Sequence, residues 1–121
     1  MAEQQDLQIA GVSLDCPDPA VLAAFYGKVL GGRTLWTKAD SAGVEASGVV
    51  LIAQRVPDYV PPTWPGTSVV HLDLAAGLDL EASVAFAVAS GAKRTAHQPD
   101  PRWYVLLDPA GHPFCITTMT P

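Results

Sequence analysis

The stretch VSLDCPDPAVLAAFYGKVLGG, residues 12–32, joins a strand to a helix and decides the fold. Its first five residues alternate between apolar and polar, which is typical of a strand with one buried face. Asp18 suits a helix N-cap, and Pro19 stands at the first helical position, where an N–H is not needed. Gly31–Gly32 suits the end of the helix, because glycine readily takes the left-handed conformation of a C-terminus. This stretch therefore predicts a strand over 7–16 followed by a helix.

Two further strand-like segments complete the first half of the chain. They cover residues 33–39 and 43–56, and Ser47–Gly48 is a turn signal that divides the second segment into two strands. Residues 57–66, PDYVPPTWPG, contain four prolines, and proline cannot donate the hydrogen bonds of a helix interior or a central strand. We therefore predict a β-α-β-β-β module over about 7–56 and a linker over 57–66.

The same pattern restarts after the linker. Residues 67–75 alternate again, and a helix with Asp79 as its N-cap runs to Gly91. The two caps, Asp18 and Asp79, lie 61 residues apart, which we interpret as an internal repeat with a second module over about 67–120. Three more strand candidates follow this helix, over residues 94–98, 102–108 and 113–119.

The repeat predicts an α+β fold in which two β-α-β-β-β modules form a single domain over residues 1–121. A four-stranded sheet covered by one helix has one packed face and one free face. Two modules side by side would present their free faces as a curved groove of mixed sheet, and concave surfaces of this kind are where small ligands bind. Exposed sheet edges and apolar surface predict that the chain forms a homodimer.

The composition excludes several classes of protein. Hydrophobic residues make up 49% of the chain and charged residues 16%, which predicts a packed core rather than disorder. The net charge of −5 argues against a nucleic-acid partner, and the chain has neither an apolar run nor a basic stretch suited to a membrane. The polar first residues lack the pattern of a secretion signal, so we expect a cytoplasmic location. Cys16 and Cys115 are expected to be free thiols, with a disulfide between them left open.

Four segments resemble the vicinal oxygen chelate superfamily, which includes the glyoxalases, the bleomycin resistance proteins and a group of dioxygenases. They are residues 12–32, 49–57, 69–92 and 105–116, the last of which reads VLLDPAGHPFCI. The resemblance implies a glyoxalase-like pair of modules, usually completed by dimerisation, with a site inside the sheet groove. It also implies that enzymes of this kind bind one divalent metal there, through ligands on the first and last strands of each module.

The family's metal positions can be read residue by residue in this sequence. The first strand offers Gly11 or Ser13, depending on the gap between the repeats, and the other strands offer Gln54, His71 and Cys115. Only the imidazole and the thiolate are strong ligands, and an amide and a thiol stand where the family's enzymes usually carry carboxylates. We therefore expect no metal. Should one bind, zinc on Gln54, His71 and Cys115 suits these ligands best.

Each of these residues also has a purely structural interpretation. His71 can be a neutral histidine hydrogen-bonded to Asp73, and Asp15 and Asp73 can be solvated carboxylates rather than general bases. Cys115 can be a small strand residue, because a nucleophilic role needs a base such as His71 to lower its pKa. His112 lies in the turn DPAGHP and is expected to face solvent, so His112 and Cys115 are not predicted to chelate a metal together.

The aromatic residues support a binding role. Trp36 and Trp103 fall between the second and third strands of their modules, where their rings can line a groove or pack at an interface, and Trp64 is expected to anchor the linker. The expected ligand-binding residues are Trp36, Gln54, His71, Asp73, Trp103 and Cys115.

Three functions are compatible with this site. The favoured one is a metal-independent binding protein that encloses a small aromatic or apolar molecule. The second is a metal-dependent glyoxalase-type lyase, isomerase or dioxygenase, and the third is a structural or regulatory module without catalysis. No catalytic residue is assigned, and the substrate is not named by the sequence.

Overall fold

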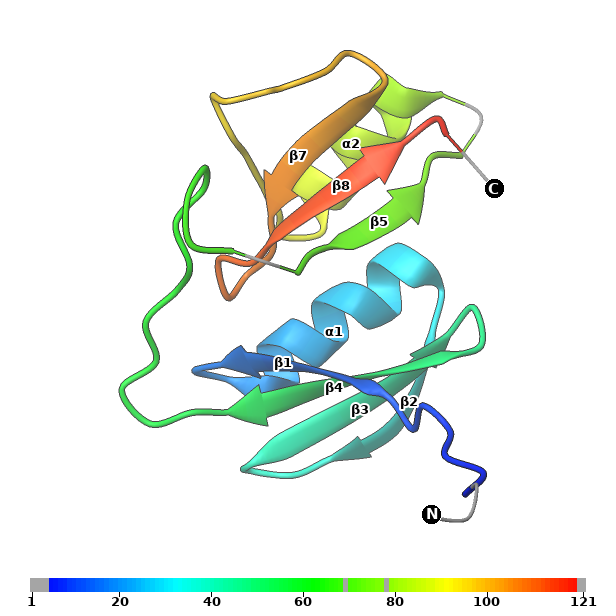
Figure 1. Cartoon of the computed structure of the whole chain (residues 1–121), viewed down its shortest axis with the longest axis vertical. Helices are drawn as coiled ribbons and strands as arrows, with labels where there is room; N and C mark the ends of the chain where they lie inside the picture. Colours follow the sequence, from blue (N-terminus) through cyan, green and yellow to red (C-terminus); the bar gives the residue numbers. More distant parts are fainter. Residues whose placement is uncertain (1–4, 69, 78, 120–121) are drawn as a thin grey trace.

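The structure is a computed structural model that describes residues 5–68, 70–77 and 79–119. The chain runs β-α-β-β-β twice, and each repeat forms its own sheet (Figure 1). The α+β class and the paired modules are therefore confirmed. In the first module the elements are β1 (Val12–Cys16), α1 (Pro19–Leu30), β2 (Arg33–Thr37), β3 (Ser41–Ala46) and β4 (Val49–Arg55). In the second they are β5 (Leu72–Ala75), α2 (Leu80–Ala89), β6 (Lys93–Arg94), β7 (Trp103–Leu107) and β8 (Pro113–Thr117).

Both sheets are mixed and have equivalent strand orders, β1-β4-β3-β2 and β5-β8-β7-β6. In each module the first strand pairs in parallel with the last, and the remaining neighbours are antiparallel. Within the described chain the two sheets do not pair with each other, and α1 lies between the first sheet and the second module (Figure 1). The free faces of the sheets are thus separate surfaces in one chain. No helix in the described residues is long and apolar enough to cross a membrane.

The helix and turn signals of the sequence are confirmed. The Asp18 carboxylate accepts the Ala20 N–H at 3.1 Å, and Pro19 opens α1. Gly31 ends α1 with a φ of 61°, a conformation that disfavours residues with a side chain. Ser47 and Gly48 form the tight turn between β3 and β4, both with positive φ.

Strand lengths are where the sequence prediction was wrong. The strand predicted over 7–16 begins only at Val12, which the parallel register pairs with Leu51. Because β4 begins at Val49, two residues before Leu51, residues 7–9 have no partner in that strand. The strand predicted over 67–75 begins at Leu72, because the next residue of β8 in register is Pro113, which has no N–H to donate.

The strand predicted over 94–98 is shortened to β6, Lys93–Arg94, for another reason. The side-chain amide of Gln98 accepts the Val105 N–H at 2.8 Å and donates to the Val105 carbonyl at 2.8 Å. One side chain thus makes the two hydrogen bonds that a strand backbone would have made with β7. β2, β4, β7 and β8 end one or two residues earlier than predicted, at Thr37, Arg55, Leu107 and Thr117, and β3 begins two residues earlier, at Ser41.

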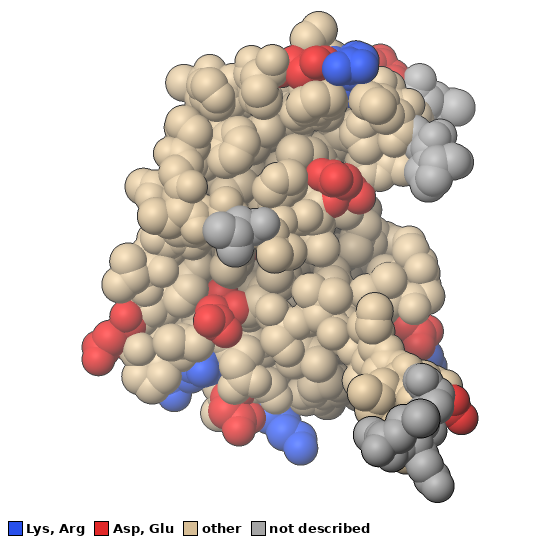
Figure 2. All heavy atoms as spheres, in the orientation of Figure 1, with Lys and Arg blue, Asp and Glu red and all other residues tan. Residues whose placement is uncertain are grey.

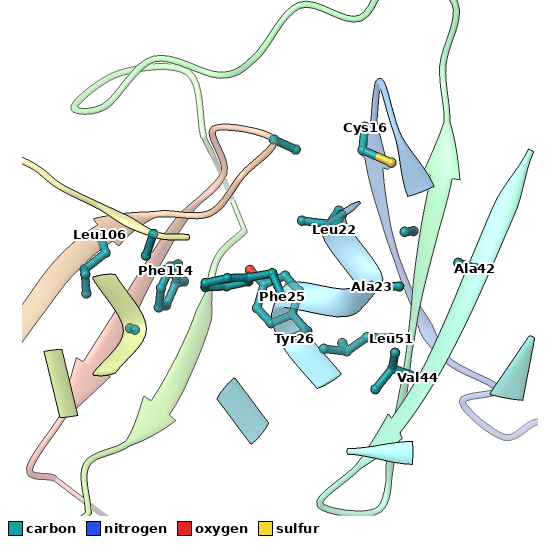
Figure 3. Packing of buried hydrophobic residues seen from close by; sticks show 14 of the residues in the cluster. Cys16, Leu22, Ala23, Phe25, Tyr26, Ala42, Val44, Leu51, Leu106 and Phe114 are labelled. Atoms are coloured by element: carbon teal, nitrogen blue, oxygen red, sulfur yellow. The ribbon is translucent and has the colours of Figure 1, made fainter. Parts of the chain in front are cut away.

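A single core joins the two modules. On α1, Ala23 faces the strand that carries Ala42, whereas Phe25 reaches across to Phe114 of β8 (Figure 3). The ring centroids of Phe25 and Tyr26 lie 5.8 and 6.2 Å from that of Phe114. All of these side chains are buried, so α1 supplies apolar surface to both modules.

A buried hydrogen bond accompanies this contact. The Tyr26 hydroxyl donates to the Asp108 carboxylate at 2.7 Å, and the other oxygen of Asp108 accepts the N–H groups of Ala110 and His112 at 2.9 and 3.0 Å. Burial raises the pKa of Asp108 even though these hydrogen bonds act in the opposite direction. Asp108 therefore shapes the turn between β7 and β8 and ties this turn to α1.

Candidate functional site

A pocket of about 660 Å³ lies on the face of the second sheet that α2 does not cover, the face turned toward the viewer in Figure 1. On β8, Phe114 and Ile116 face the core, so alternation directs Cys115 and Thr117 to the opposite face. The floor of the pocket consists of His71, Asp73, Ala75, Cys115 and Thr117, and its walls consist of Trp64, Pro99, Trp103 and Met119.

The floor is polar and is built by two adjacent strands. Asp73 of β5 and Cys115 of β8 are partners in the parallel register. His71, just before β5, places its Nδ1 at 3.5 Å from an Asp73 carboxylate oxygen. The Asp73 side chain is 63% exposed, whereas Cys115 is 6% exposed. A carboxylate is thus open to an incoming ligand, beside a thiol that is mostly covered.

The environment of Cys115 keeps its thiol protonated. Burial, followed by the charge of Asp73 and a hydrogen bond to it, raises the pKa of Cys115 to about 11. Because the thiolate is the nucleophilic form, these effects oppose covalent catalysis by Cys115 near neutral pH. Cys16 and Cys115 are both free thiols, so the disulfide that the sequence left open is not formed in this structure, and Cys16 is fully buried in the core.

The walls of the pocket are aromatic and apolar. Trp64 comes from the linker, where its indole N–H donates to the His97 carbonyl at 3.1 Å, and its ring lies 6.4 Å from that of His71 in an edge-on arrangement. Trp64 therefore anchors the linker as predicted and also bounds the pocket. The guanidinium of Arg102 stacks over the Trp103 ring, 5.4 Å from its centroid.

Four of the six predicted ligand-binding residues lie together in this pocket: His71, Asp73, Trp103 and Cys115. Trp36 and Gln54 are on the first module, outside its lining. The Trp36 ring lies over Gly43, where a Cβ would be 2.3 Å from the ring, and its indole N–H donates to the Ser41 hydroxyl at 3.0 Å. The Gln54 amide donates to the Asp40 carbonyl at 3.4 Å. The role of these two residues in ligand binding stays a prediction.

Asp15 and His112 also differ from their expected places. Asp15, predicted to share a groove face with Asp73, is paired with Gln54 in the first sheet and does not line the pocket. His112, expected to face solvent, is half-buried, with its Nε2 at 2.6 Å from the Asp15 carbonyl. It bridges the two modules.

Sequence reasoning missed five lining residues, Trp64, Ala75, Pro99, Thr117 and Met119. Ala75 alternates with Asp73 on β5 and Thr117 with Cys115 on β8, so both were accessible to the same argument from periodicity. The other three lie outside the regular elements, where no periodicity indicates which way a side chain points.

Three potential metal ligands meet on the pocket floor. The ligand atoms of His71, Asp73 and Cys115 all lie within 4.8 Å of one another. This set shares two residues with the predicted one and has Asp73 in place of Gln54. Imidazole, carboxylate and thiolate together suit zinc better than Mn²⁺, which prefers oxygen ligands. A metal would also have to displace the thiol proton against the raised pKa of Cys115.

Comparisons with known proteins identify the family. The sequence model of the glyoxalase-like domain matches residues 11–117. No curated protein sequence gives a significant match. Among solved structures, a mutant of the fosfomycin resistance protein FosX from Listeria monocytogenes, complexed with Mn(II) and 1S,2S-dihydroxypropylphosphonic acid, is similar with a TM-score of 0.71 and 12% identity. The match covers 93% of this chain and 90% of that one.

Two further solved structures have the same fold. A glyoxalase-related enzyme from Fulvimarina pelagi has a TM-score of 0.66 and 24% identity, over 91% of this chain and 86% of that one. The hypothetical protein SA1046 from S. aureus has a TM-score of 0.69 and 19% identity, over 96% of this chain and 97% of that one. The chain therefore belongs to the glyoxalase-like domain family, within the vicinal oxygen chelate superfamily.

Proposed function

We propose that the chain binds a small molecule with an aromatic or apolar body in the pocket on the second sheet, and that binding does not require a metal. The observation that carries this proposal is the pairing of two indole walls, Trp64 and Trp103, with a polar floor. Ligand pockets commonly occupy roughly 300–1,000 Å³ and combine apolar walls with a few polar groups that orient the ligand. At about 660 Å³, this pocket falls within that range.

Tryptophan fluorescence offers a direct test. The chain has three tryptophans, and Trp36 is the one outside the pocket. In a Trp36→Phe variant, the remaining emission comes from Trp64 and Trp103, so a ligand in the pocket should change it. The same ligand should raise the melting temperature as its concentration exceeds Kd. Aromatic metabolites and antibiotics are suitable compounds for the screen, with a chelator present throughout.

Substitution separates the pocket from other surfaces. Trp103→Ala should weaken binding of any compound found in this way, whereas Trp36→Phe should leave it unchanged. If no compound alters fluorescence or stability, or if Trp103→Ala has no effect on the hits, the metal-independent binding function is wrong.

A second candidate, a metal-dependent glyoxalase-type enzyme, is favoured by the grouping of His71, Asp73 and Cys115. When bound, a zinc ion would supply Lewis-acid chemistry at the floor of the pocket. Calorimetric titration with zinc and with manganese tests this, using Cys115→Ser and the matched control Cys16→Ala. Stoichiometric zinc binding that Cys115→Ser abolishes and Cys16→Ala retains would favour the enzyme. Absence of binding in the unsubstituted protein would rule out this donor set.

A further inference from the structure

We infer that this pocket selects ligands whose aromatic or apolar body carries a cationic or N–H donor group, and that it discriminates against anionic ligands. The inference rests on the proposed function and narrows its ligand class. Its basis is one accessible carboxylate, Asp73, in a pocket that Trp64 and Trp103 also line and that has no Lys or Arg among its described lining residues.

The charges around the pocket have one sign. Asp73 is the one carboxylate in the described lining, and its side chain is 63% exposed. Arg102, directly before β7, is the basic neighbour of Trp103, and its guanidinium is held by the Asp100 carboxylate at 2.8 and 2.9 Å. An anion entering the pocket would therefore meet the Asp73 carboxylate and no Lys or Arg in the described lining.

The surface surrounding the pocket has the same character. On the face shown in Figure 2, no Lys or Arg is visible over the middle, and the blue spheres lie near the upper end and the lower margin. The chain as a whole carries a net charge of −5. A long-range field of this sign favours the approach of cations over anions.

The Asp73 carboxylate has spare capacity to bind a donor. Its contacts are with His71 Nδ1 at 3.5 Å and with the Cys115 thiol, and the side chain remains 63% exposed. An ionised carboxylate offers about four lone-pair positions, so an ammonium or N–H group can be added without breaking these contacts.

The indole walls favour the same charge. A cation over an indole ring gains roughly 0.5–2 kcal/mol, depending on how far it is desolvated. Trp103 already has the Arg102 guanidinium stacked on its ring, so Trp64 is the indole of the lining without a stacked Arg among the described residues. A cationic ligand could gain from that ring as well as from the Asp73 carboxylate.

The similar FosX structure provides a contrast. Its ligand is a phosphonic acid, and it is bound together with Mn(II). A ligand of that kind would meet no cationic side chain in the described lining of the present pocket. The same fold would thus serve ligands of the opposite charge.

Three indoles that differ in one group provide the test: tryptamine, which is a cation, indole-3-propionate, which is an anion, and the neutral 3-propylindole. Binding is measured by calorimetry with EDTA present, so that a bound metal cannot recruit the anion, and at about pH 8, where histidine side chains are ordinarily neutral. We expect tryptamine to bind at least about tenfold more tightly than indole-3-propionate, since opposite charges near a protein surface differ in energy by more than the 1.4 kcal/mol that corresponds to this ratio.

Variants assign the preference to one residue. Asp73→Asn should reduce the ratio to within about twofold, and Asp73→Glu should restore the preference for the cation. Asp40→Asn is the matched control, because it removes the same charge from an exposed residue outside the pocket and should leave the ratio unchanged.

The outcomes are distinguishable from those of the proposed function. Equal or tighter binding of indole-3-propionate would overturn the charge preference while leaving ligand binding intact. A preference that survives Asp73→Asn would overturn the role of Asp73. If none of the three compounds binds or stabilises the protein, both the charge preference and the binding function fall.

Discussion

The two modules have the same order of elements but are built for different tasks. Helix α1 buries five side chains, whereas α2 buries two. The edge strand β2 has five residues, whereas its counterpart β6 has two. The first module therefore supplies most of the packed core, and the second is the lighter of the two.

The free faces of the two sheets also differ, in how each uses its tryptophan. In the first module the Trp36 ring packs against Gly43 and its indole N–H donates to the Ser41 hydroxyl, so this ring is engaged within its own sheet. In the second module, Trp103 stands at the wall of an open pocket whose floor carries Asp73. One repeat thus supplies most of the core, and the other carries the pocket to which we assign ligand binding. Four predictions test this division.

The largest effect is expected where the second module depends on α1. Phe114 is fully buried against Phe25 and Tyr26, so Phe114→Ala should lower the free energy of unfolding by about 3–5 kcal/mol. Phe86 of α2 is 47% exposed, and Phe86→Ala is the control, with an expected loss below about 1 kcal/mol. Urea denaturation measures both. Similar losses for the two variants would contradict the dependence of the second module on its contact with α1.

The next effect concerns the thiols of the two modules. Raising the pKa of Cys115 from 9.0 to about 11 lowers its thiolate fraction about 100-fold at any pH below both values, so alkylation by iodoacetamide should be slow at pH 8 and rise toward pH 11. Asp73→Asn should speed the reaction at pH 8, because the charge of Asp73 contributes to the shift. Peptide mass spectrometry separates Cys115 from the fully buried Cys16. A reaction midpoint near pH 9 would contradict this account.

A smaller effect is expected at the short edge of the second sheet. Gln98→Ala removes both amide hydrogen bonds to Val105, which should cost about 1–2 kcal/mol of stability. Hydrogen exchange should show the loss at the Val105 amide first. Unchanged protection at that amide would mean that the side chain of Gln98 is not completing the ladder.

The smallest effect is a dependence of stability on pH. The pKa of Asp108 is raised from 3.8, so the folded state holds the proton more tightly than the unfolded chain. Its contribution to stability is therefore largest at low pH and declines as the pH rises from about 3.8 through the raised value. The difference in unfolding free energy between the unsubstituted protein and Asp108→Asn should fall over this window, by less than about 1.4 kcal/mol per pH unit. A difference that grows with pH would reverse the assigned cause.

Local signals in the sequence predicted the local structure well. Asp18, Gly31 and the Ser47–Gly48 turn act over a few neighbouring residues, and each is where the sequence placed it. Strand ends failed because they depend on the partner strand. Neither the missing N–H of Pro113 opposite β5 nor the side-chain ladder of Gln98 can be seen from periodicity alone.

The candidate site shows the same difference between local signals, which predicted structure, and long-range packing, which the sequence did not reveal. His71, Asp73 and Cys115 come together because alternation places Asp73 and Cys115 on one face of two adjacent strands and His71 directly precedes one of them. Trp36 and Gln54 were grouped with them because the repeat makes their positions equivalent, but equivalence in a repeat does not determine how two modules pack. Trp64 came from an irregular linker, whose course depends on contacts such as the one with His97.

The hydrogen bond between Tyr26 and Asp108 has a consequence for how such a chain can change over evolution. Asp108 shapes a turn in one repeat while its carboxylate accepts a hydrogen bond from Tyr26 of the other. A fragment that encodes either repeat alone would expose Phe25 or Phe114 and leave Tyr26 or Asp108 without its hydrogen-bond partner. The two halves, although they read as a duplication, are now interdependent, so recombination at the linker that exchanges one half for that of a distant relative must replace both sides of this contact together.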